Sequence, residues 1–166
     1  LDQHTLEIKW RTIVGNIGEI AVAANFDTDP QDEIVTRNGY VFDAENGANQ
    51  WLYEGRSSFY TLYQESLGYS LGVYRETGDA LRLVDFHNKS HTDIHTGIIN
   101  FRTMGTGNLD ADQDDELIVV GFSDTTLFDY DKDTQSLAIS GTYPVSYSQN
   151  MTVIQNFTDD NKAALV

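Results

Sequence analysis

Acidic side chains are concentrated in two loops, at residues 25–33 and 108–116, which share one pattern. In each loop an Asn, two Asp and a Glu occupy positions 1, 3, 5 and 9, and an apolar, β-branched run follows at once. Like charges packed this closely repel one another unless a cation neutralises them. The spacing therefore predicts a cation site in each loop.

Calcium is the cation that we expect. It prefers six to eight hard oxygen ligands, and alternate residues of a tight loop can direct their oxygens to one centre. An EF-hand does not fit, because it needs a Glu at position 12 and flanking helices, whereas position 12 is Thr36 or Val119 here. The alternative that stays open is a solvated acidic turn between strands.

The composition fits one globular domain with a substantial core. The chain has 166 residues, of which 40% are hydrophobic, and a net charge of −16. This charge argues against nucleic acid and anionic membranes as partners, because both attract basic patches. No apolar stretch approaches the roughly 18 residues of a membrane span, so we expect no membrane insertion. Cysteine is absent, which excludes disulfides and thiolate metal sites. The chain starts at Leu1, and we expect it to be a processed or excised segment.

Short β-strands are the elements that must position these loops. Tyr, Phe, Val, Ile and Thr are abundant, and no window shows apolar residues at helical spacing over three turns. The runs 19–26, 33–37, 40–43 and 50–53 are expected to form four antiparallel strands. Asn38-Gly39 and Asn46-Gly47, two dipeptides typical of hairpin turns, separate the last three.

The same unit recurs along the chain. Residues 41–47 are echoed by 83–89 and by 127–133, an alignment that matches Asp43 with Asp85 and Asp129. A period of roughly 40–50 residues with four strands each is typical of β-propeller blades. We therefore predict an all-β fold, a β-propeller with about three and a half four-stranded antiparallel blades. The expected blades lie at about 15–55, 56–95, 96–143 and, incomplete, 144–166. A ring needs at least about four blades, so we expect a section of a larger propeller, or partner chains that complete it.

The acidic loops resemble the FG-GAP/VCBS repeats of integrin-α-like propellers, in which an Asp-x-Asp/Asn-x-Asp-Gly-x-x-Asp calcium loop runs into a Leu/Ile-Val-Val strand. The resemblance implies two sets of calcium ligands, with Asp114 contributing its main-chain carbonyl: Asn25, Asp27, Asp29, Gln31 and Glu33, and Asn108, Asp110, Asp112, Asp114 and Glu116. The chain departs from the family at position 6, where Pro30 and Gln113 replace Gly, and at position 9, where Glu replaces Asp. In a third copy, residues 156–166, Thr158 and Ala164 replace ligands, and we expect weak binding or none.

A second resemblance overlaps the first. Residues 40–51, Tyr-Val-Phe-Asp-Ala-Glu-Asn-Gly-Ala-Asn-Gln-Trp, are similar to PQQ-like propeller repeats, which typically end in Gly-x-x-x-Trp. In the expected second blade, the loop position near residues 66–70 has lost the acids. Both resemblances specify architecture more than task, because propellers serve as enzymes, adhesins and scaffolds alike.

Two other groups of side chains have alternative uses. His87, His91 and His95 would align for zinc on a helix, but residues four apart on an extended strand are about 13 Å apart, so a polar turn is expected. Five tyrosines either pack between blades or form a platform for sugar rings: Tyr53, Tyr60, Tyr63, Tyr69 and Tyr74. The sequence contains no nucleophile elbow, phosphate loop or dinucleotide fingerprint.

The family resemblance implies a calcium-stabilised, non-catalytic propeller module for protein or glycan recognition or scaffolding. Its expected location is extracellular, at a cell surface or in the periplasm. Two alternatives stay open: a calcium-containing propeller enzyme of the polysaccharide lyase or quinone-dependent dehydrogenase type, and a lectin-like sugar-binding propeller. The expected partners are calcium, a protein or carbohydrate ligand, and the blades or chains that complete the ring.

Overall fold

The fold consists of β-strands and turns. The computed structural model describes residues 8–13, 15–16, 18–53, 59–76, 78–98, 101–110, 112–144, 153–154 and 164–165. These residues contain no helix, so the all-β expectation is confirmed, and none of them forms a helical segment able to cross a membrane. Most of the third acidic copy, at residues 156–166, lies outside the described part of the chain.

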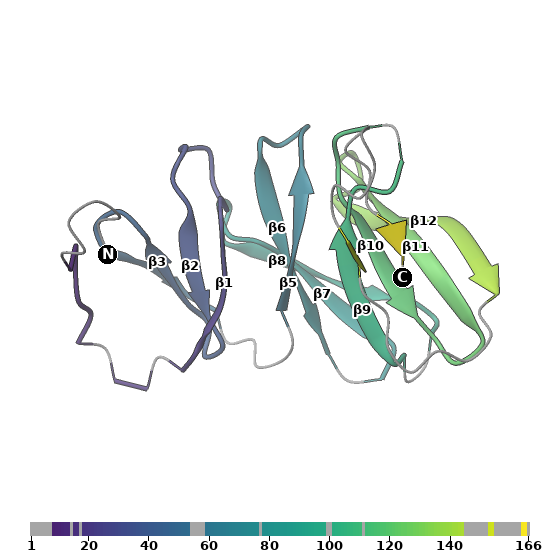
Figure 1. Cartoon of the computed structure of the whole chain (residues 1–166), viewed down its shortest axis with the longest axis horizontal. Coiled ribbons are helices and arrows are strands. Elements are labelled where there is room, and N and C mark those ends of the chain that lie inside the picture. Colours follow the sequence, from purple (N-terminus) through teal and green to yellow (C-terminus); the bar gives the residue numbers. More distant parts are fainter. Residues whose placement is uncertain are drawn as a thin grey trace.

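Three four-stranded antiparallel sheets and one two-stranded sheet make up the described structure (Figure 1). In each four-stranded sheet, strands that are neighbours in the chain are neighbours in the sheet. The first sheet contains β1 (Ile20–Ala24), β2 (Glu33–Thr36), β3 (Tyr40–Asp43) and β4 (Asn49–Leu52). The second contains β5 (Phe59–Gln64), β6 (Tyr69–Arg75), β7 (Ala80–Asp85) and β8 (Ser90–His95). The third contains β9 (Thr103–Gly107), β10 (Glu116–Val120), β11 (Asp124–Asp131) and β12 (Ser136–Pro144), and β13 (Val153–Ile154) pairs with β14 (Ala164–Leu165).

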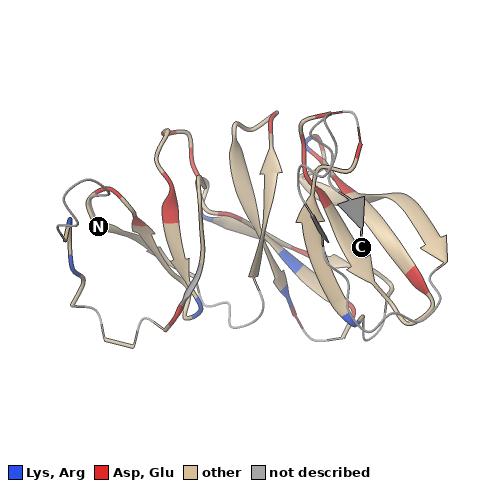
Figure 2. Ribbon diagram, in the orientation of Figure 1, with Lys and Arg blue, Asp and Glu red and all other residues tan. Residues whose placement is uncertain are grey.

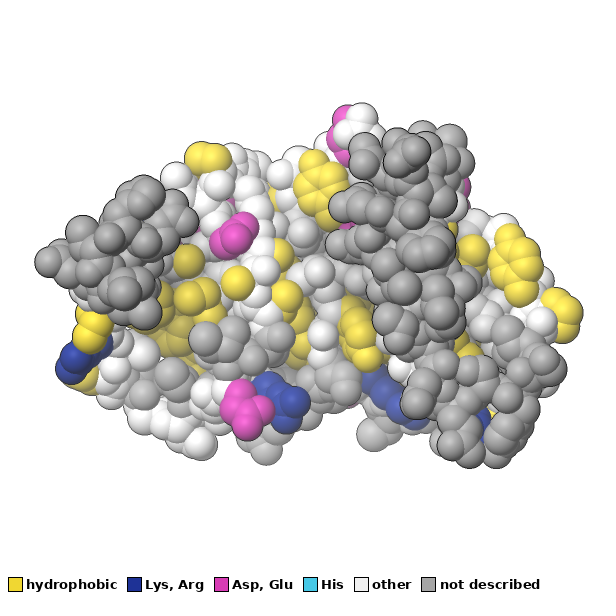
Figure 3. All heavy atoms as spheres, viewed as in Figure 1, with side chains coloured by type: hydrophobic (Ala, Val, Ile, Leu, Met, Phe, Trp, Pro, Cys, Tyr) yellow, Lys and Arg dark blue, Asp and Glu magenta, His cyan; other side chains and the backbone are white. Residues whose placement is uncertain are grey.

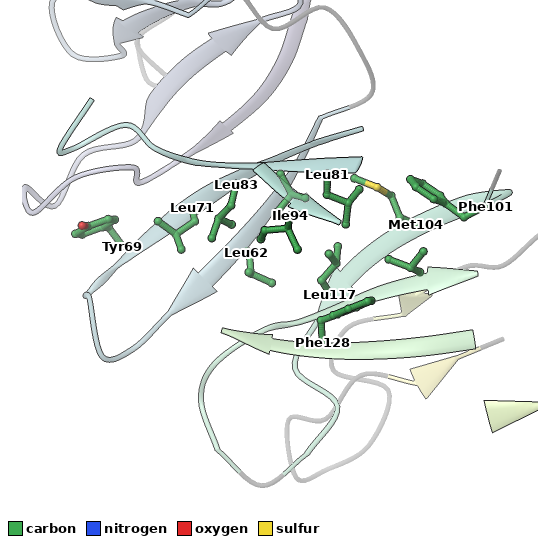
Figure 4. Packing of buried hydrophobic residues seen from close by; sticks show 12 residues of the cluster. Leu62, Tyr69, Leu71, Leu81, Leu83, Ile94, Phe101, Met104, Leu117 and Phe128 are labelled. Atoms are coloured by element: carbon green, nitrogen blue, oxygen red, sulfur yellow. The ribbon is translucent and has the colours of Figure 1, made fainter. Parts of the chain in front are cut away.

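Two apolar cores join the sheets face to face. An aromatic core lies between the first two sheets, where the ring centroids of Phe26 and Phe86 are 4.9 Å apart and Tyr74 is buried. A largely aliphatic core lies between the second and third sheets (Figure 4). Side chains alternate along a strand, so Leu117 and Val119 of β10 enter this second core from one face of the third sheet.

The first strands of successive sheets contact one another. β1 contacts β5, β5 contacts β9, and β9 contacts β13, which places the sheets in a row (Figure 1). Each sheet is an antiparallel meander, so the turn after each first strand emerges at the same edge of the row. Both acidic loops and the β5–β6 turn therefore lie along the upper edge in Figure 1.

The turn between β2 and β3 is not the two-residue turn that an Asn-Gly dipeptide typically forms, because only its glycine has a positive φ. Gly39 donates its main-chain N–H to the carbonyl of Thr36 at 2.9 Å and has a φ of 83°, whereas Asn38 does not have a positive φ. This is a turn followed by one left-handed residue. Gly47, Lys89 and Gln135, with φ values of 75°, 53° and 50°, share another position: each is the fourth residue after the Asp that ends β3, β7 or β11. The left-handed residue is thus a repeated feature that glycine does not always fill.

Trp10 covers the face of the first sheet that points away from the second. Its indole nitrogen donates to the carbonyl oxygen of Ala44 at 2.8 Å, and its ring lies 6.2 Å from that of Phe42, which is buried. Elsewhere, hydrophobic side chains on the visible face are spread among polar and backbone atoms (Figure 3).

Candidate metal centre

The loop between β1 and β2 is wound by hydrogen bonds from main-chain N–H groups to side-chain oxygens two residues earlier. The N–H groups of Asp27, Asp29 and Gln31 donate to Asn25 Oδ1, Asp27 Oδ1 and Asp29 Oδ1 at 3.0, 2.8 and 2.8 Å. The Asn25 amide nitrogen donates to the carbonyl oxygen of Asp29 at 2.5 Å. These bonds turn the side chains at alternate positions toward the inside of the loop.

The loop between β9 and β10 repeats this winding. The N–H groups of Asp112 and Asp114 donate to Asp110 Oδ1 and Asp112 Oδ1 at 2.9 and 3.0 Å, and the Asn108 amide donates to the carbonyl oxygen of Asp112 at 2.5 Å. Position 4 of this loop, Ala111, lies outside the described residues. Figure 2 shows acidic residues along both loops. Two stretches far apart in the chain therefore have the same local geometry.

A glutamate at the start of the following strand closes each loop. The N–H of Phe26 donates to Glu33 Oε2 at 2.7 Å, and the N–H of Leu109 donates to Glu116 Oε2. Both glutamates are buried, with exposed fractions of 1% and 4%. A buried carboxylate needs a compensating partner, and in each glutamate one oxygen accepts the N–H of a loop residue.

The structure brings together the carboxylates at positions 3, 5 and 9 of each loop. One oxygen each from Asp27, Asp29 and Glu33 lies within 4.8 Å of the others, and the same holds for a second triad, Asp110, Asp112 and Glu116. Among the other predicted ligands, Asn25, Gln31 and Asn108 carry no carboxylate and lie in the same two loops, and Asp114 is outside the second triad. Asp114 directs its carboxylate to the second sheet, where it accepts the N–H of Glu65 at 2.5 Å.

Burial and mutual repulsion shift the ionisation of the closing glutamates. Burial raises the pKa of Glu33 to about 7, and the charges of Asp27, Asp29 and Asp43 add to the effect, while the Phe26 N–H opposes it. Burial, with the charges of Asp110, Asp112 and Asp129, likewise raises the pKa of Glu116 to about 7. A cation would remove the repulsion that causes part of both shifts.

One buried oxygen points more directly to a ligand. Glu33 Oε1 is shielded from solvent and accepts no hydrogen bond, although the same carboxylate belongs to the triad of the first loop. An unpartnered buried carboxylate oxygen is unfavourable by roughly 1–3 kcal/mol or more. The donor set around it consists of oxygen atoms, which hard divalent cations prefer.

In the first and third sheets, a carboxylate from the third strand also lies near the site, and the spacing within the loops does not predict it. Glu33 is the cross-strand partner of Asp43. In the third sheet Leu117 pairs with Phe128, which puts Asp129 beside Glu116, and Asp129 Oδ1 is buried without a hydrogen bond. The recurrence of Asp at positions 43, 85 and 129 was the sequence signal that could have pointed to Asp43 and Asp129.

Neither residue at position 6 needs a left-handed backbone. Positive φ values among the described non-glycine residues occur at Asn16, Lys89 and Gln135, and not at Pro30 or Gln113. The loops therefore wind without the glycine of the family pattern, because the side-chain oxygens of the preceding residues hold the main chain.

The histidines and most of the tyrosines belong to the framework. His95 contacts Asp79 at 3.3 Å, whereas His91 and His87 lie beside the rings of Tyr53 and Tyr69, with centroids 6.1 and 5.3 Å apart. The histidines are not part of either group of metal-ligand atoms found among the described residues. Tyr53, Tyr69 and Tyr74 are buried, which fits the packing alternative for these three side chains.

Comparisons with protein-family models, curated proteins and solved structures gave no match. The fold and the site together define a class: an all-β protein of four-stranded antiparallel sheets in which two loops each bring three carboxylates together.

Proposed function

We propose that this chain is a calcium-stabilised β-propeller module that serves in protein or glycan recognition or as a scaffold. The observation that carries the proposal is the buried Glu33 Oε1, which has no hydrogen-bond partner in a triad of carboxylates. The second loop supports it, because Asp110, Asp112 and Glu116 adopt the same arrangement in another sheet. A feature repeated between sheets is better explained as a stabilising element than as a single active centre.

The strand order supports the propeller part of the proposal. Propeller blades are four-stranded sheets arranged radially around a central channel. Here every four-stranded sheet is a meander of consecutive strands, and its first strand contacts the first strand of the next sheet. Further blades, or partner chains, would complete the ring.

The chemistry of the loops supports calcium over other divalent cations. Magnesium binds in small octahedral sites and retains several waters, whereas calcium accepts a larger number of protein oxygens in a flexible geometry. In the first loop, Asp27, Asp29 and Glu33 would bind through carboxylates, and Asn25 through its side-chain oxygen, with the carbonyl of Gln31 adding one more. We also propose an extracellular, cell-surface or periplasmic location; calcium modules outside cells function with dissociation constants of about 10⁻⁴–10⁻³ M.

Calorimetric titration with calcium tests the proposal, with magnesium as the competing ion. We expect two calcium sites, and a melting temperature that rises with calcium and falls with chelator. At a hundredfold excess over the dissociation constant, each site stabilises the folded state by about 2.7 kcal/mol. Unchanged melting curves in calcium and in excess chelator would contradict the proposal.

A further inference from the structure

The β5–β6 hairpin of the second sheet does not carry an acidic loop of this pattern, but it forms hydrogen bonds with both acidic loops. On one side Asp115, which follows the predicted ligand Asp114, donates its N–H to the carbonyl oxygen of Tyr63 at 2.8 Å. The N–H of Tyr63 donates in return to Asp115 Oδ2 at 3.0 Å, and the side chain of Gln64 donates to the carbonyl of Asp115 at 3.1 Å. The second loop is therefore fastened to the end of β5.

On the other side the first loop is bonded to β6. The N–H of Ser70 donates to the carbonyl oxygen of Asn25 at 2.8 Å, and Ser70 is buried. Asn25 is position 1 of the first loop, and the next residue, Phe26, is buried in the aromatic core with its ring 5.8 Å from that of Phe59. The first loop is therefore fixed to the second sheet by a hydrogen bond and by an aromatic side chain.

These two attachments meet at one cross-strand pair. Tyr63 and Ser70 are directly opposite each other in the β5–β6 register. Their main-chain groups point outward, those of Tyr63 to the second loop and that of Ser70 to the first. The turn between them is held further by Lys132 of the third sheet, whose Nζ donates to the carbonyl of Ser66 at 2.7 Å.

We propose that the two cation sites are coupled through this Tyr63–Ser70 pair, so that calcium in either loop strengthens binding in the other. The inference rests on the proposed function, since it assumes that both loops bind calcium. Binding at the second loop orders Asp114 and Asp115 and with them the end of β5. The first loop then meets a hairpin that is already ordered, so less conformational entropy is lost when it binds. Linkage makes the effect equal in both directions.

The two loops differ in how they make this contact, which supplies a matched control. Asp32 occupies position 8 of the first loop, as Asp115 does of the second. Its carbonyl accepts the N–H of Ala44 at 3.2 Å within the first sheet, and Asp32 is exposed. Replacing Asp32 therefore removes the same charge from the equivalent position without touching the hairpin.

Calcium titration followed by NMR reports each loop separately, through the amides of Phe26 and Leu109. In D112A, which removes a ligand of the second loop, we expect the affinity of the first loop to fall about fivefold or more. D115A, which keeps every predicted ligand, should have a similar effect on the first loop. D115N carries the same charge as D115A but retains an acceptor for Tyr63, so its first loop should bind nearly as in the wild type. D32A, the counterpart of D115A in the first loop, should leave the affinity of the second loop unchanged.

Hydrogen exchange of the wild-type protein gives a second measurement that needs no variant. The amides of Tyr63 and Ser70 should both exchange about fivefold more slowly when only the tighter site is filled. An unchanged affinity of the first loop in D112A and D115A, with calcium still bound there, overturns the coupling and leaves the proposed function standing. Absence of any calcium-dependent shift in the wild type overturns both.

Discussion

Glu33 and Asp43 face each other across β2 and β3, at the edge of the sheet from which the first acidic loop emerges. Their roles are different. Glu33 is buried and closes the loop, whereas Asp43 caps the next turn, where Oδ1 accepts the N–H of Glu45 at 2.7 Å. Asp43 thus both lies opposite the closing glutamate and caps a turn. In the third sheet two residues share these tasks: Asp129 lies beside Glu116, and Asp131 caps the turn by accepting the N–H of Asp133 at 2.9 Å.

This division leads to a prediction for Asp129. In D129N the repulsion with Glu116 disappears, so the metal-free protein should be more stable by about 0.2–1 kcal/mol, as for other facing like charges. Calcium affinity of the second loop should fall several-fold, because the site loses negative charge. The matched control is D131N, which retains a capping oxygen and should change neither quantity. Chemical denaturation without metal measures the stability of D129N and D131N, and calorimetric titration measures their calcium affinity. Equal stabilities and equal affinities in the two variants would contradict the role given to Asp129.

The raised pKa values of Glu33 and Glu116 predict how metal-free stability depends on pH. Both groups move from 4.5 to about 7 on folding, so the folded protein holds these protons more tightly than the unfolded chain. Their contribution is fully present below pH 4.5 and is lost as the pH rises through about 7. The unfolding free energy of the metal-free protein should therefore contain a component that decreases across this window, and E33Q and E116Q should each reduce that decrease.

Calcium binding should release protons in the same window. At pH 6 both glutamates are largely protonated in the metal-free protein, and ligation requires the carboxylate form. The calorimetric binding enthalpy should therefore depend on the ionisation enthalpy of the buffer at pH 6 and much less at pH 8. Equal enthalpies in phosphate-free buffers of different ionisation enthalpy at pH 6 would show that the glutamates do not deprotonate on binding.

The sequence predicted what is local in the chain. The expected strands 33–37 and 40–43 correspond to β2 and β3 within one residue, because apolar alternation and a turn dipeptide bound them on both sides. The triad positions of each loop were also predicted, since all three lie within one short loop. Asp115 was missed because its partner, Tyr63, is remote in sequence, and only the packing of two sheets brings the two together.

Repeat alignment was less reliable where strand lengths differ. The sequence alignment matches Asp129 with Asp43. This match is correct for the carboxylate that lies beside the closing glutamate, but the residue that caps the following turn is Asp131. β11 has 8 residues and β3 has 4, although both pair irregularly with the next strand at matching positions, Leu127/Phe128 and Val41/Phe42. Strand length depends on pairing with the neighbouring strand, which an alignment of short motifs does not include.

A cross-strand ion pair should stabilise the second sheet measurably. Arg82 and Asp93 are opposite each other on β7 and β8, with hydrogen bonds of 2.5 and 2.9 Å from the guanidinium to both carboxylate oxygens. D93A should lower the unfolding free energy by about 0.5–1 kcal/mol, with a smaller loss at high salt. The control is E19A, because Glu19 is largely exposed and lies 3.4 Å from Arg37, so its removal should have almost no effect. Similar losses of unfolding free energy in D93A and E19A would show that the two hydrogen bonds between Arg82 and Asp93 add nothing over an exposed ion pair.

The hairpin between β2 and β3 should tolerate no side chain at Gly39. A Cβ there would lie 1.3 Å from the carbonyl oxygen of Tyr53, a main-chain atom that cannot rotate away, and the φ of 83° adds strain. We expect G39A to destabilise the protein by at least about 2 kcal/mol. Gly78 separates the two causes, because it has a φ of 75° but nothing within 4 Å of its Cβ position. G78A should therefore cost only about 1 kcal/mol, and equal losses in urea denaturation would mean that backbone strain alone, and not the contact with Tyr53, requires glycine at position 39.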